Sequence, residues 1–93
     1  MTPYDRDRVT LSQLVLEELA GLRTVFVVVE FGARKYPDRR WLKQSAHEHV
    51  THAIEHGKAW LAGTKIDPES KISNLAHMGL RSLFAVAKEL GIK

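Results

Sequence analysis

Cysteine is missing from this chain, and proline and glycine are sparse, with 3 and 6 residues respectively. The lack of cysteine excludes disulfide bonds, thiolate nucleophiles and cysteine-ligated zinc, so histidine and carboxylate side chains are the metal ligands that remain. No segment approaches the roughly 18 consecutive apolar residues of a membrane span. The first residues are polar and charged, unlike an apolar signal sequence. We therefore expect a cytoplasmic protein that makes no contact with a membrane.

The chain has 93 residues, and we expect 1–93 to form a single all-α domain that begins with a flexible polar arm at 1–10. A domain this short buries little apolar surface by itself, so we expect its helices to complete their packing in a homo-oligomer. The formal net charge is +3 at pH 7 and the sequence pI is about 9.5. This charge favours an anionic partner, which a nucleotide, a nucleic acid or an acidic protein would each satisfy.

Apolar residues at helical spacing predict a long first helix. Thr10 and Gln13 have the spacing of a capping box, so the helix should begin there and run to a C-terminal cap at Gly32. Its segment at 24–29 is β-branched and aromatic and would also suit a buried strand, but the apolar stripe continues through it without a turn signal. Pro37 prevents the helix from running on.

Two further helices follow. Ser45 and Glu48 form a capping-box pair at the start of the second helix, and Gly63 closes it. We expect the core-facing stripe of this helix to consist of Val50, Ile54, Gly57 and Leu61. A short connection then contains Asp67, which is placed to cap a helical turn, before apolar residues repeat at helical spacing over 75–90 in the third helix.

Histidine is concentrated in the predicted second helix. At about 100° per residue, one stripe of roughly 80° contains His49, His52, His56 and Trp60. Glu48 and Glu55 lie beyond the histidines on the side away from the predicted core. Imidazole binds metals and exchanges protons near neutral pH, and carboxylates hold magnesium or manganese. The alternative is that these histidines are half-buried residues bonded to neighbouring groups, and the pattern leaves both interpretations open.

The connection between the first two helices is basic and aromatic. Its residues of these types are Arg34, Lys35, Arg39, Arg40 and Lys43, with Tyr36 and Trp41 between them. Cationic groups beside aromatic rings suit a nucleotide, because the charges contact the phosphates while a ring stacks on the base. A solvated basic loop is the alternative. Asp67 and Glu69 similarly fit either helix-capping acids or metal ligands on a loop that faces the histidines.

Several short motifs follow one another along the chain in a specific order. They are Gly32-Ala-Arg-Lys-Tyr36, Trp41, His56, Trp60-Leu-Ala-Gly63, Ile66-Asp-Pro-Glu-Ser70 and Leu75-Ala-His77. This set resembles the N-terminal domain of the dATP/dGTP diphosphohydrolases, which are found largely in phages. That family looks like a branch of the all-α nucleotide pyrophosphatases related to MazG, which form helical bundles by oligomerising. The resemblance covers about 11–90, and its order is more specific than any single motif.

The resemblance implies a metal-dependent hydrolase that cleaves a deoxynucleoside triphosphate, preferably a purine, to the monophosphate and pyrophosphate. It implies Mg²⁺ or Mn²⁺ as the cofactor and, for a phage-encoded enzyme, the host cytoplasm as its location. The catalytic residues that it implies are His56, Asp67, Glu69 and His77. Together with the basic connection, it gives as substrate-binding residues Lys35, Tyr36, Arg39, Trp41 and Trp60. The expected metal ligands are Asp67 and Glu69, with Glu55 and Glu48 of the histidine-rich helix.

The chain also departs from the pattern of that family. The departures are Glu55 for the usual arginine, Thr64 for an acid, Lys71 for glycine, Asn74 for histidine and Arg81 for asparagine. In addition, Glu17 and Glu18 lack the further acid one turn later that the MazG-type metal motif requires. These differences indicate an altered substrate or a lost activity. The alternative function is a non-catalytic, phage-encoded interaction or inhibitor protein whose basic surface binds a host protein or a nucleic acid.

A helix-turn-helix DNA-binding module ranks last, because the connection between the second and third helices is long and acidic. The hydrolase prediction has one geometric condition. The imidazole of His56 and the carboxylates of Asp67 and Glu69 must converge on one cavity.

Overall fold

The computed structural model describes the backbone of residues 11–92 and the side chains of residues 19–92. Its elements are α2 (Leu11–Lys35), the short 3-10 helix η1 (Arg40–Lys43), α3 (Ala46–Leu61) and α4 (Asn74–Glu89). Within the described residues, strand-like pairing is limited to one isolated bridge between Ile66 and Ser73. The fold is therefore all-α with three long helices, as the sequence predicts. The predicted arm at 1–10, with the Thr10 cap, lies outside the described residues.

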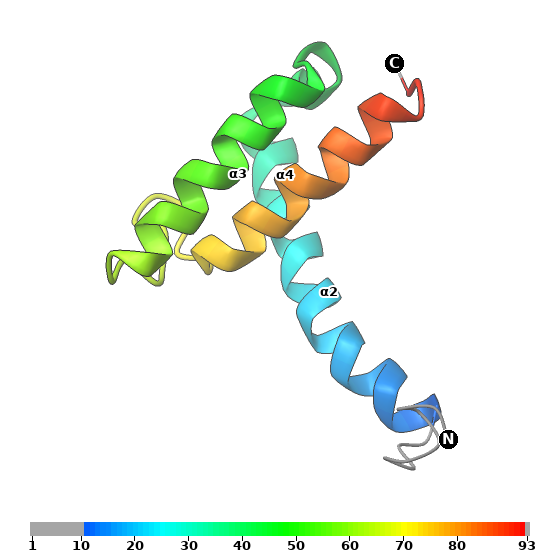
Figure 1. Cartoon of the computed structure of the whole chain (residues 1–93), viewed down its shortest axis with the longest axis vertical. Helices are drawn as coiled ribbons and strands as arrows, with labels where there is room; N and C mark the ends of the chain where they lie inside the picture. Colours follow the sequence, from blue (N-terminus) through cyan, green and yellow to red (C-terminus); the bar gives the residue numbers. More distant parts are fainter. Residues whose placement is uncertain (1–10, 93) are drawn as a thin grey trace.

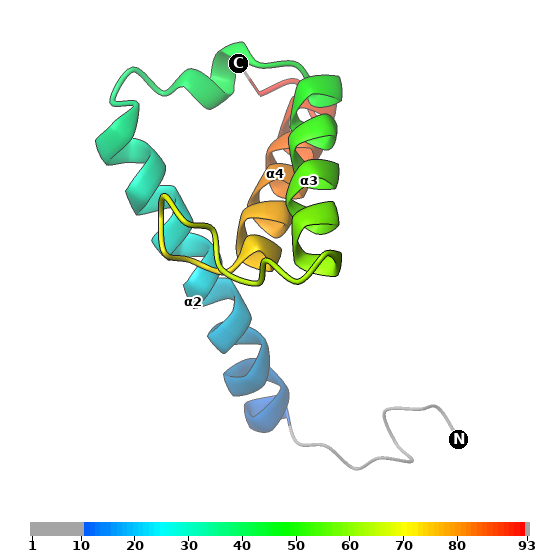
Figure 2. The ribbon, with the colours of Figure 1, turned by 90° about the vertical axis from the view of Figure 1, so that its left-hand side faces the viewer.

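α3 and α4 lie side by side, and α2 crosses behind this pair and extends away from it (Figure 1). The connection between α2 and α3, which contains η1, crosses one end of the molecule (Figure 2). The connection between α3 and α4 passes α2, and there Glu69 forms an ion pair with Lys35 at the end of α2. Both connections thus lie on the side of the α3–α4 pair that α2 covers.

The apolar core is small and lies between α2 and α4. Its buried members are Val28, Ala76 and Leu80, and the side chains packed against them are Val25, Ile72 and Phe84. α3 contributes Ala53, which is also buried, and Gly57. Met78 of α4 places its Sδ 3.1 Å from the point where a Cβ on Gly57 would lie, so a larger residue there would require the end of the Met78 side chain to move.

The first helix spans Leu11–Lys35 and remains helical through 24–29, as predicted. The predicted end at Gly32 is wrong, because the helix continues to Lys35. Gly32 keeps a helical backbone rather than the left-handed one of a C-terminal cap, and its carbonyl accepts a hydrogen bond from Tyr36 N at 2.7 Å. Pro37 follows at once, and its ring and missing N–H prevent a further turn.

The predicted signals at the other helix ends are confirmed. Ser45 Oγ accepts a hydrogen bond from Glu48 N at 3.1 Å, and Glu48 Oε1 accepts one from Ser45 N at 3.2 Å, which completes the capping box of α3. Gly63 and Gly91 follow α3 and α4 with φ angles of 105° and 85°, which L side chains rarely adopt. Asp67 Oδ2 accepts from Ser70 N at 2.8 Å, so this acid caps a turn, as expected.

The predicted core stripe of α3 is wrong for this chain by itself. Val50, Ile54 and Leu61 are 45%, 49% and 78% exposed, whereas His49 and Ala53 are buried. The side of α3 with His49, Ala53 and Gly57 faces α4, and of the predicted stripe only Gly57 lies against it, because Ala53 and Gly57 are small and allow a close approach between the helices. The larger apolar residues are thereby left on the outer surface of α3.

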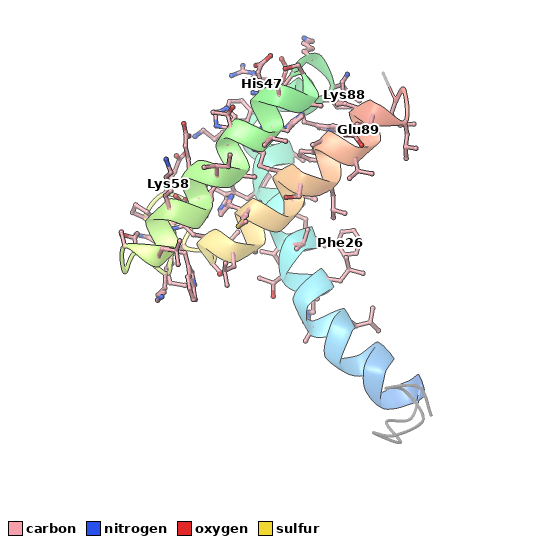
Figure 3. The ribbon with its side chains drawn as sticks, viewed as in Figure 1. Phe26, His47, Lys58, Lys88 and Glu89 are labelled. Carbon is pink, nitrogen blue, oxygen red and sulfur yellow. The ribbon has the colours of Figure 1, made fainter. Side chains whose placement is uncertain are left out.

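α2 also leaves large apolar side chains in solvent. Leu19, Leu22, Phe26, Val27 and Val29 are between 38% and 58% exposed. Phe26 extends outward from α2 (Figure 3). No helix within 11–92 is long and apolar enough to cross a membrane. Formation of a homo-oligomer stays a prediction. The exposed apolar side chains of α2 are consistent with it, because a second copy of the chain would cover them.

Candidate functional site

A cavity of about 650 Å³ opens where α2, η1, α3, α4 and the connection before α4 meet. Part of its wall is apolar, with Val28, Phe31, Leu80 and Phe84. The predicted site residues that line it are Lys35, Tyr36, Arg39, Trp41, His56, Asp67, Glu69 and His77. The imidazole of His56 and both loop acids therefore share one cavity, which meets the geometric condition of the hydrolase prediction.

Three of the predicted residues lie outside the lining of this cavity. Glu48 is used in the capping box of α3. Glu55 Oε2 lies 3.5 Å from His52 Nδ1 at an exposed position. Trp60 lies one turn beyond His56 on α3, and the ammonium of Lys65 sits 3.3 Å from the centre of its ring. Their predicted roles in metal and substrate binding gain no support from the geometry.

His56 and His77 form the centre of the polar wall. Their rings stack with centroids 4.6 Å apart and an interplanar angle of 14°. His56 Nδ1 lies 2.8 Å from Asn74 Oδ1, and His77 Nε2 lies 2.7 Å from Ser70 Oγ. Each imidazole is thus held by a ring contact and by a hydrogen bond to a neutral side chain.

Asp67 is fixed in its ionised form. Burial raises the pKa of this carboxyl, but hydrogen bonds from the backbone and hydroxyl of Ser70 outweigh burial and hold the pKa below its usual value. Its Oδ2 lies 3.9 Å from His77 Nε2. Burial lowers the pKa of His77, and the charge of the neighbouring His56 lowers it further. His77 is therefore a neutral imidazole at neutral pH, beside an anionic Asp67.

Cationic side chains surround the rest of the cavity. The guanidinium of Arg39 lies 5.9 Å from the ring centre of Trp41, and that of Arg40 lies 4.2 Å from the ring centre of Tyr36. Lys35 is paired with Glu69. By contrast, among the described residues neither Arg39 nor Arg40 has a carboxylate oxygen within 4.0 Å. These two guanidinium groups are available to an anion.

Arg81 adds a third guanidinium to the lining. Its Nη1 donates to Gln44 Oε1 at 2.6 Å and lies 3.1 Å from His49 Nδ1. Burial lowers the pKa of Arg81, although a guanidinium stays charged at any physiological pH. Within the side chains that the structure describes, no carboxylate forms an ion pair with it. The charge of Glu55 acts on this guanidinium from beyond ion-pair distance. A half-buried cation with no carboxylate in contact favours a negatively charged ligand.

The aromatic side chains are already engaged. Trp41 stacks on Phe84, with centroids 4.4 Å apart and an interplanar angle of 10°. Arg39 approaches the same indole. A base that stacked on the other face of Trp41 would therefore compete with Arg39, and the phosphates of the same ligand would attract that guanidinium.

His49 shows that one member of the predicted histidine stripe is structural. Its side chain is fully buried. Its Nε2 lies 2.9 Å from the carbonyl oxygen of Trp41, and its Nδ1 faces Arg81. Burial lowers the pKa of His49, so the ring is neutral. His49 is therefore a structural residue bonded to neighbouring groups, and it is buried more completely than expected, while His52 and His56 line the cavity.

Three lining residues with charged or titratable side chains were missed as site residues in the sequence, namely Arg40, His52 and Arg81. Arg40 and His52 stood in the recognised basic and histidine-rich patterns, so their signal was present. For Arg81 the available signal was its position one helical turn after His77, which places both on the same face of α4.

The acids offer an incomplete set of metal ligands. Within the described part of the chain, no three histidine, aspartate or glutamate side chains are grouped closely enough to hold a metal ion. Glu69 is paired with Lys35, and Asp67 Oδ2 accepts from Ser70 N. These residues therefore do not form a resident metal site by themselves.

The model of the dATP/dGTP diphosphohydrolase N-terminal family matches residues 2–92. Neither the curated proteins nor the solved structures contain a significant match to the chain.

Proposed function

The chain belongs to the dATP/dGTP diphosphohydrolase N-terminal family, and on that basis we propose that it hydrolyses a purine deoxynucleoside triphosphate to the monophosphate and pyrophosphate. The observation that carries the proposal is the convergence of His56, Asp67 and Glu69 on one cavity that also contains unpaired guanidinium groups. A cavity of about 650 Å³ lies within the usual range for a small-molecule site.

The triphosphate binds to the cationic part of the cavity. Arg39, Arg40 and Arg81 come from the connection after α2 and from α4, so they contact the phosphate chain from different sides. Guanidinium groups suit this role because they donate paired hydrogen bonds to phosphate oxygens and stabilise the charge that develops during phosphoryl transfer. The apolar wall beside Phe31 and Leu80 receives the base and deoxyribose.

His56 accepts the proton of the attacking water. Its ring lines the cavity, and it lies beside His77 and the anionic Asp67. An imidazole is suited to this task because its ordinary pKa lies near neutral pH. His77, which is held by Ser70, stacks on the face of the His56 ring and fixes the orientation of that ring's plane.

A divalent cation enters this scheme with the nucleotide. Mg²⁺ is usually held by one or two carboxylates together with substrate phosphates. Asp67 is the cavity acid that fits this role, since its carboxylate is ionised. Glu69 joins it if Lys35 turns to the phosphates. We accordingly propose that the substrate is the Mg²⁺ or Mn²⁺ complex of the triphosphate.

The first experiment is a turnover assay on the purified chain. Each of the four common deoxynucleoside triphosphates is incubated with Mg²⁺ or Mn²⁺, and chromatography measures monophosphate and pyrophosphate. We expect dATP and dGTP to be cleaved faster than dCTP and dTTP, and a metal chelator to stop the reaction. Absence of turnover with every nucleotide and both metals would contradict the proposal.

Replacement of the proposed base gives a sharper version of this test. His56→Gln should lower kcat by about 10²- to 10⁴-fold, the usual loss when a general base is removed. His47→Gln is the matched control, because His47 is an exposed histidine on the same helix and is labelled in Figure 3. Equal activity of the two variants would exclude His56 as the base.

A second candidate function is a non-catalytic interaction protein. The observation that favours it is that one departure from the family pattern, Arg81 for asparagine, lines the cavity, and another, Asn74 for histidine, contacts the lining residue His56. Its test is a salt-sensitive gel shift with DNA or RNA and capture of a defined protein partner. Binding of this kind, with no thermal shift on addition of nucleotide and metal, would favour it over the hydrolase.

A further inference from the structure

Asn74 is a buried amide placed between the cavity histidine and the loop before α4. It is 2% exposed, and both polar atoms of its side chain form hydrogen bonds. Asn74 Nδ2 donates to the carbonyl oxygen of Thr64 at 2.8 Å, and Asn74 Oδ1 lies 2.8 Å from His56 Nδ1. Its backbone N–H donates to the carbonyl oxygen of Lys65 at 2.9 Å. The amide is thus held at both ends and at its backbone.

These contacts fix the direction of the hydrogen bond to His56. The carbonyl oxygen of Thr64 only accepts, so the NH₂ end of Asn74 must face it and the Oδ1 end must face His56. Oδ1 also only accepts, so Nδ1 of His56 must carry the proton. In the neutral ring the lone pair is then on Nε2. Nε2 makes no hydrogen bond within the described residues.

We propose that Asn74 is a positioning residue that locks His56 in the Nδ1–H tautomer, with Nε2 presented to the cavity as a hydrogen-bond acceptor. The relay runs from the carbonyl of Thr64 through the amide of Asn74 to the imidazole. That Nε2 accepts a proton from the attacking water rests on the proposed function, whereas the tautomer itself does not.

Two restraints of different kind hold this ring. The hydrogen bond to Asn74 fixes its rotation in the ring plane, and the stack on His77 fixes the plane. A free imidazole exchanges between two tautomers and many orientations, and the restrained one presents a single nitrogen to the cavity. Preorganisation of this kind raises the rate without any new contact with the substrate.

α3 contains an internal comparison, because the same reasoning gives His49 the opposite tautomer. His49 Nε2 faces the carbonyl oxygen of Trp41, which only accepts, so Nε2 carries the proton. His49 Nδ1 then accepts from Arg81 Nη1, which only donates. Two histidines of one helix are therefore expected in different tautomers, each set by a neighbouring group that the other lacks.

The test is the nitrogen NMR spectrum of the histidines in the full, ¹⁵N-labelled chain at a pH where the rings are neutral. We expect His56 to show a protonated Nδ1 and an unprotonated Nε2, and His49 to show the reverse. An Nε2–H tautomer at His56, or equal population of both tautomers, would overturn the proposal. The measurement uses the unmodified chain, so its outcome does not depend on whether a variant folds.

Variants of Asn74 link the tautomer to turnover. Asn74→Ala removes the acceptor, so the His56 signals should move toward averaged values and kcat should fall about 10-fold or more while KM changes little. Asn74→Asp keeps an oxygen acceptor at Nδ1 and should retain the tautomer, with a smaller loss of kcat. An unchanged His56 spectrum in a folded Asn74→Ala would overturn the positioning role.

The two proposals fail in distinguishable ways. The expected tautomer in a chain that cleaves no nucleotide would support the role of Asn74 at His56 and refute the hydrolase. Turnover in a chain whose His56 has the other tautomer would support the hydrolase and refute the relay from Thr64.

Discussion

Buried histidines on α3 and α4 connect single side chains to the stability of the whole domain. His49 is fully buried between the Trp41 carbonyl and Arg81, and a proton on its Nδ1 would face a guanidinium. Burial lowers the pKa of His49, and the charge of Arg81 lowers it further. Burial is also the main cause that lowers the pKa of His77. Both rings are therefore required in their neutral form when the chain is folded.

The consequence is a defined pH dependence of unfolding. In the unfolded chain the histidines have the ordinary pKa of about 6.5. As the pH falls through this pKa, the unfolded chain takes up protons before the folded one, so the free energy of unfolding decreases. We expect full stability above this value and a loss below it, measured by urea unfolding between about pH 7.5 and about pH 5.5. His49→Gln should flatten this dependence, whereas the exposed His47→Gln should leave it unchanged. A stability that does not vary over this interval would contradict the assignment.

Arg81 illustrates how one departure from the family pattern changes the ligand that the cavity prefers. Asparagine at this position would be neutral, whereas Arg81 brings a half-buried charge held by Gln44. Arg81→Gln should weaken binding of a deoxynucleoside triphosphate about 10- to 100-fold, the range expected for loss of a hydrogen bond to a charged group. Titration calorimetry measures the change, and the exposed Lys58→Gln on α3 serves as the charge-matched control. Equal affinities of the two variants would exclude Arg81 from the phosphate site.

At the scale of the elements, the loop before α4 contains a residue in an unfavourable backbone conformation. Lys71 has a φ of 63°, in the left-handed region that favours glycine. The strain of a non-glycine residue there is about 1 kcal/mol, and the extra entropy of glycine in the unfolded chain offsets part of it. We expect Lys71→Gly to raise the free energy of unfolding by up to about 1 kcal/mol, and Lys71→Ala to leave it nearly unchanged.

Chemical denaturation measures the difference in the free energy of unfolding between these variants. Gly63→Ala is the reverse substitution, because it places a side chain where glycine now adopts a positive φ. Gly63 has a φ of 105°, so an added Cβ should lower the stability by about 1 kcal/mol or more. A lower stability of Lys71→Gly than of Lys71→Ala would show that the strain at Lys71 is relieved by its surroundings.

The helix ends were predictable because their signals are local. The Ser45–Glu48 capping box and the Asp67 cap of a turn involve residues only three positions apart. η1 was not predicted. Arg39, which precedes it, has a φ of 55°, a left-handed conformation that is uncommon for a residue other than glycine. Trp41, two residues after Arg39, is stacked on Phe84 of α4. The conformation of this segment therefore depends on a contact that no local pattern contains.

The same distinction separates the predictable and unpredictable parts of the cavity. His56, Asp67, Glu69 and His77 were found because the resemblance assigns them by position. The roles of Asn74 and Arg81 depend on how α3 packs on α4, since Asn74 contacts His56 and Arg81 contacts His49 across that interface. Periodicity predicted a helix here, but it selected Val50 and Ile54 for the core, and both are exposed. Close packing instead favoured the stripe with Ala53 and Gly57.

At the scale of the whole molecule, α2 has one apolar stripe that no described residue covers. Val25 and Val28 pack toward α4, whereas Leu22 and Phe26 are 39% and 58% exposed on another face. The core between α2 and α4 is small, and a domain of this size gains stability by covering such a stripe. We therefore propose that a second copy of the chain covers it, which would place two cavities in one assembly.

Light scattering after gel filtration tests this at micromolar concentration. The monomer has a mass of 10.5 kDa, and we expect the chain to elute as a dimer or a larger species. Its thermal midpoint should rise with protein concentration, because association stabilises the folded state by mass action. Phe26→Lys should shift the mass toward the monomer, whereas Glu89→Gln makes the same change in charge at an exposed position and should not (Figure 3). A monomeric wild-type chain with a concentration-independent midpoint would mean that the stripe on α2 is covered by something other than a second copy.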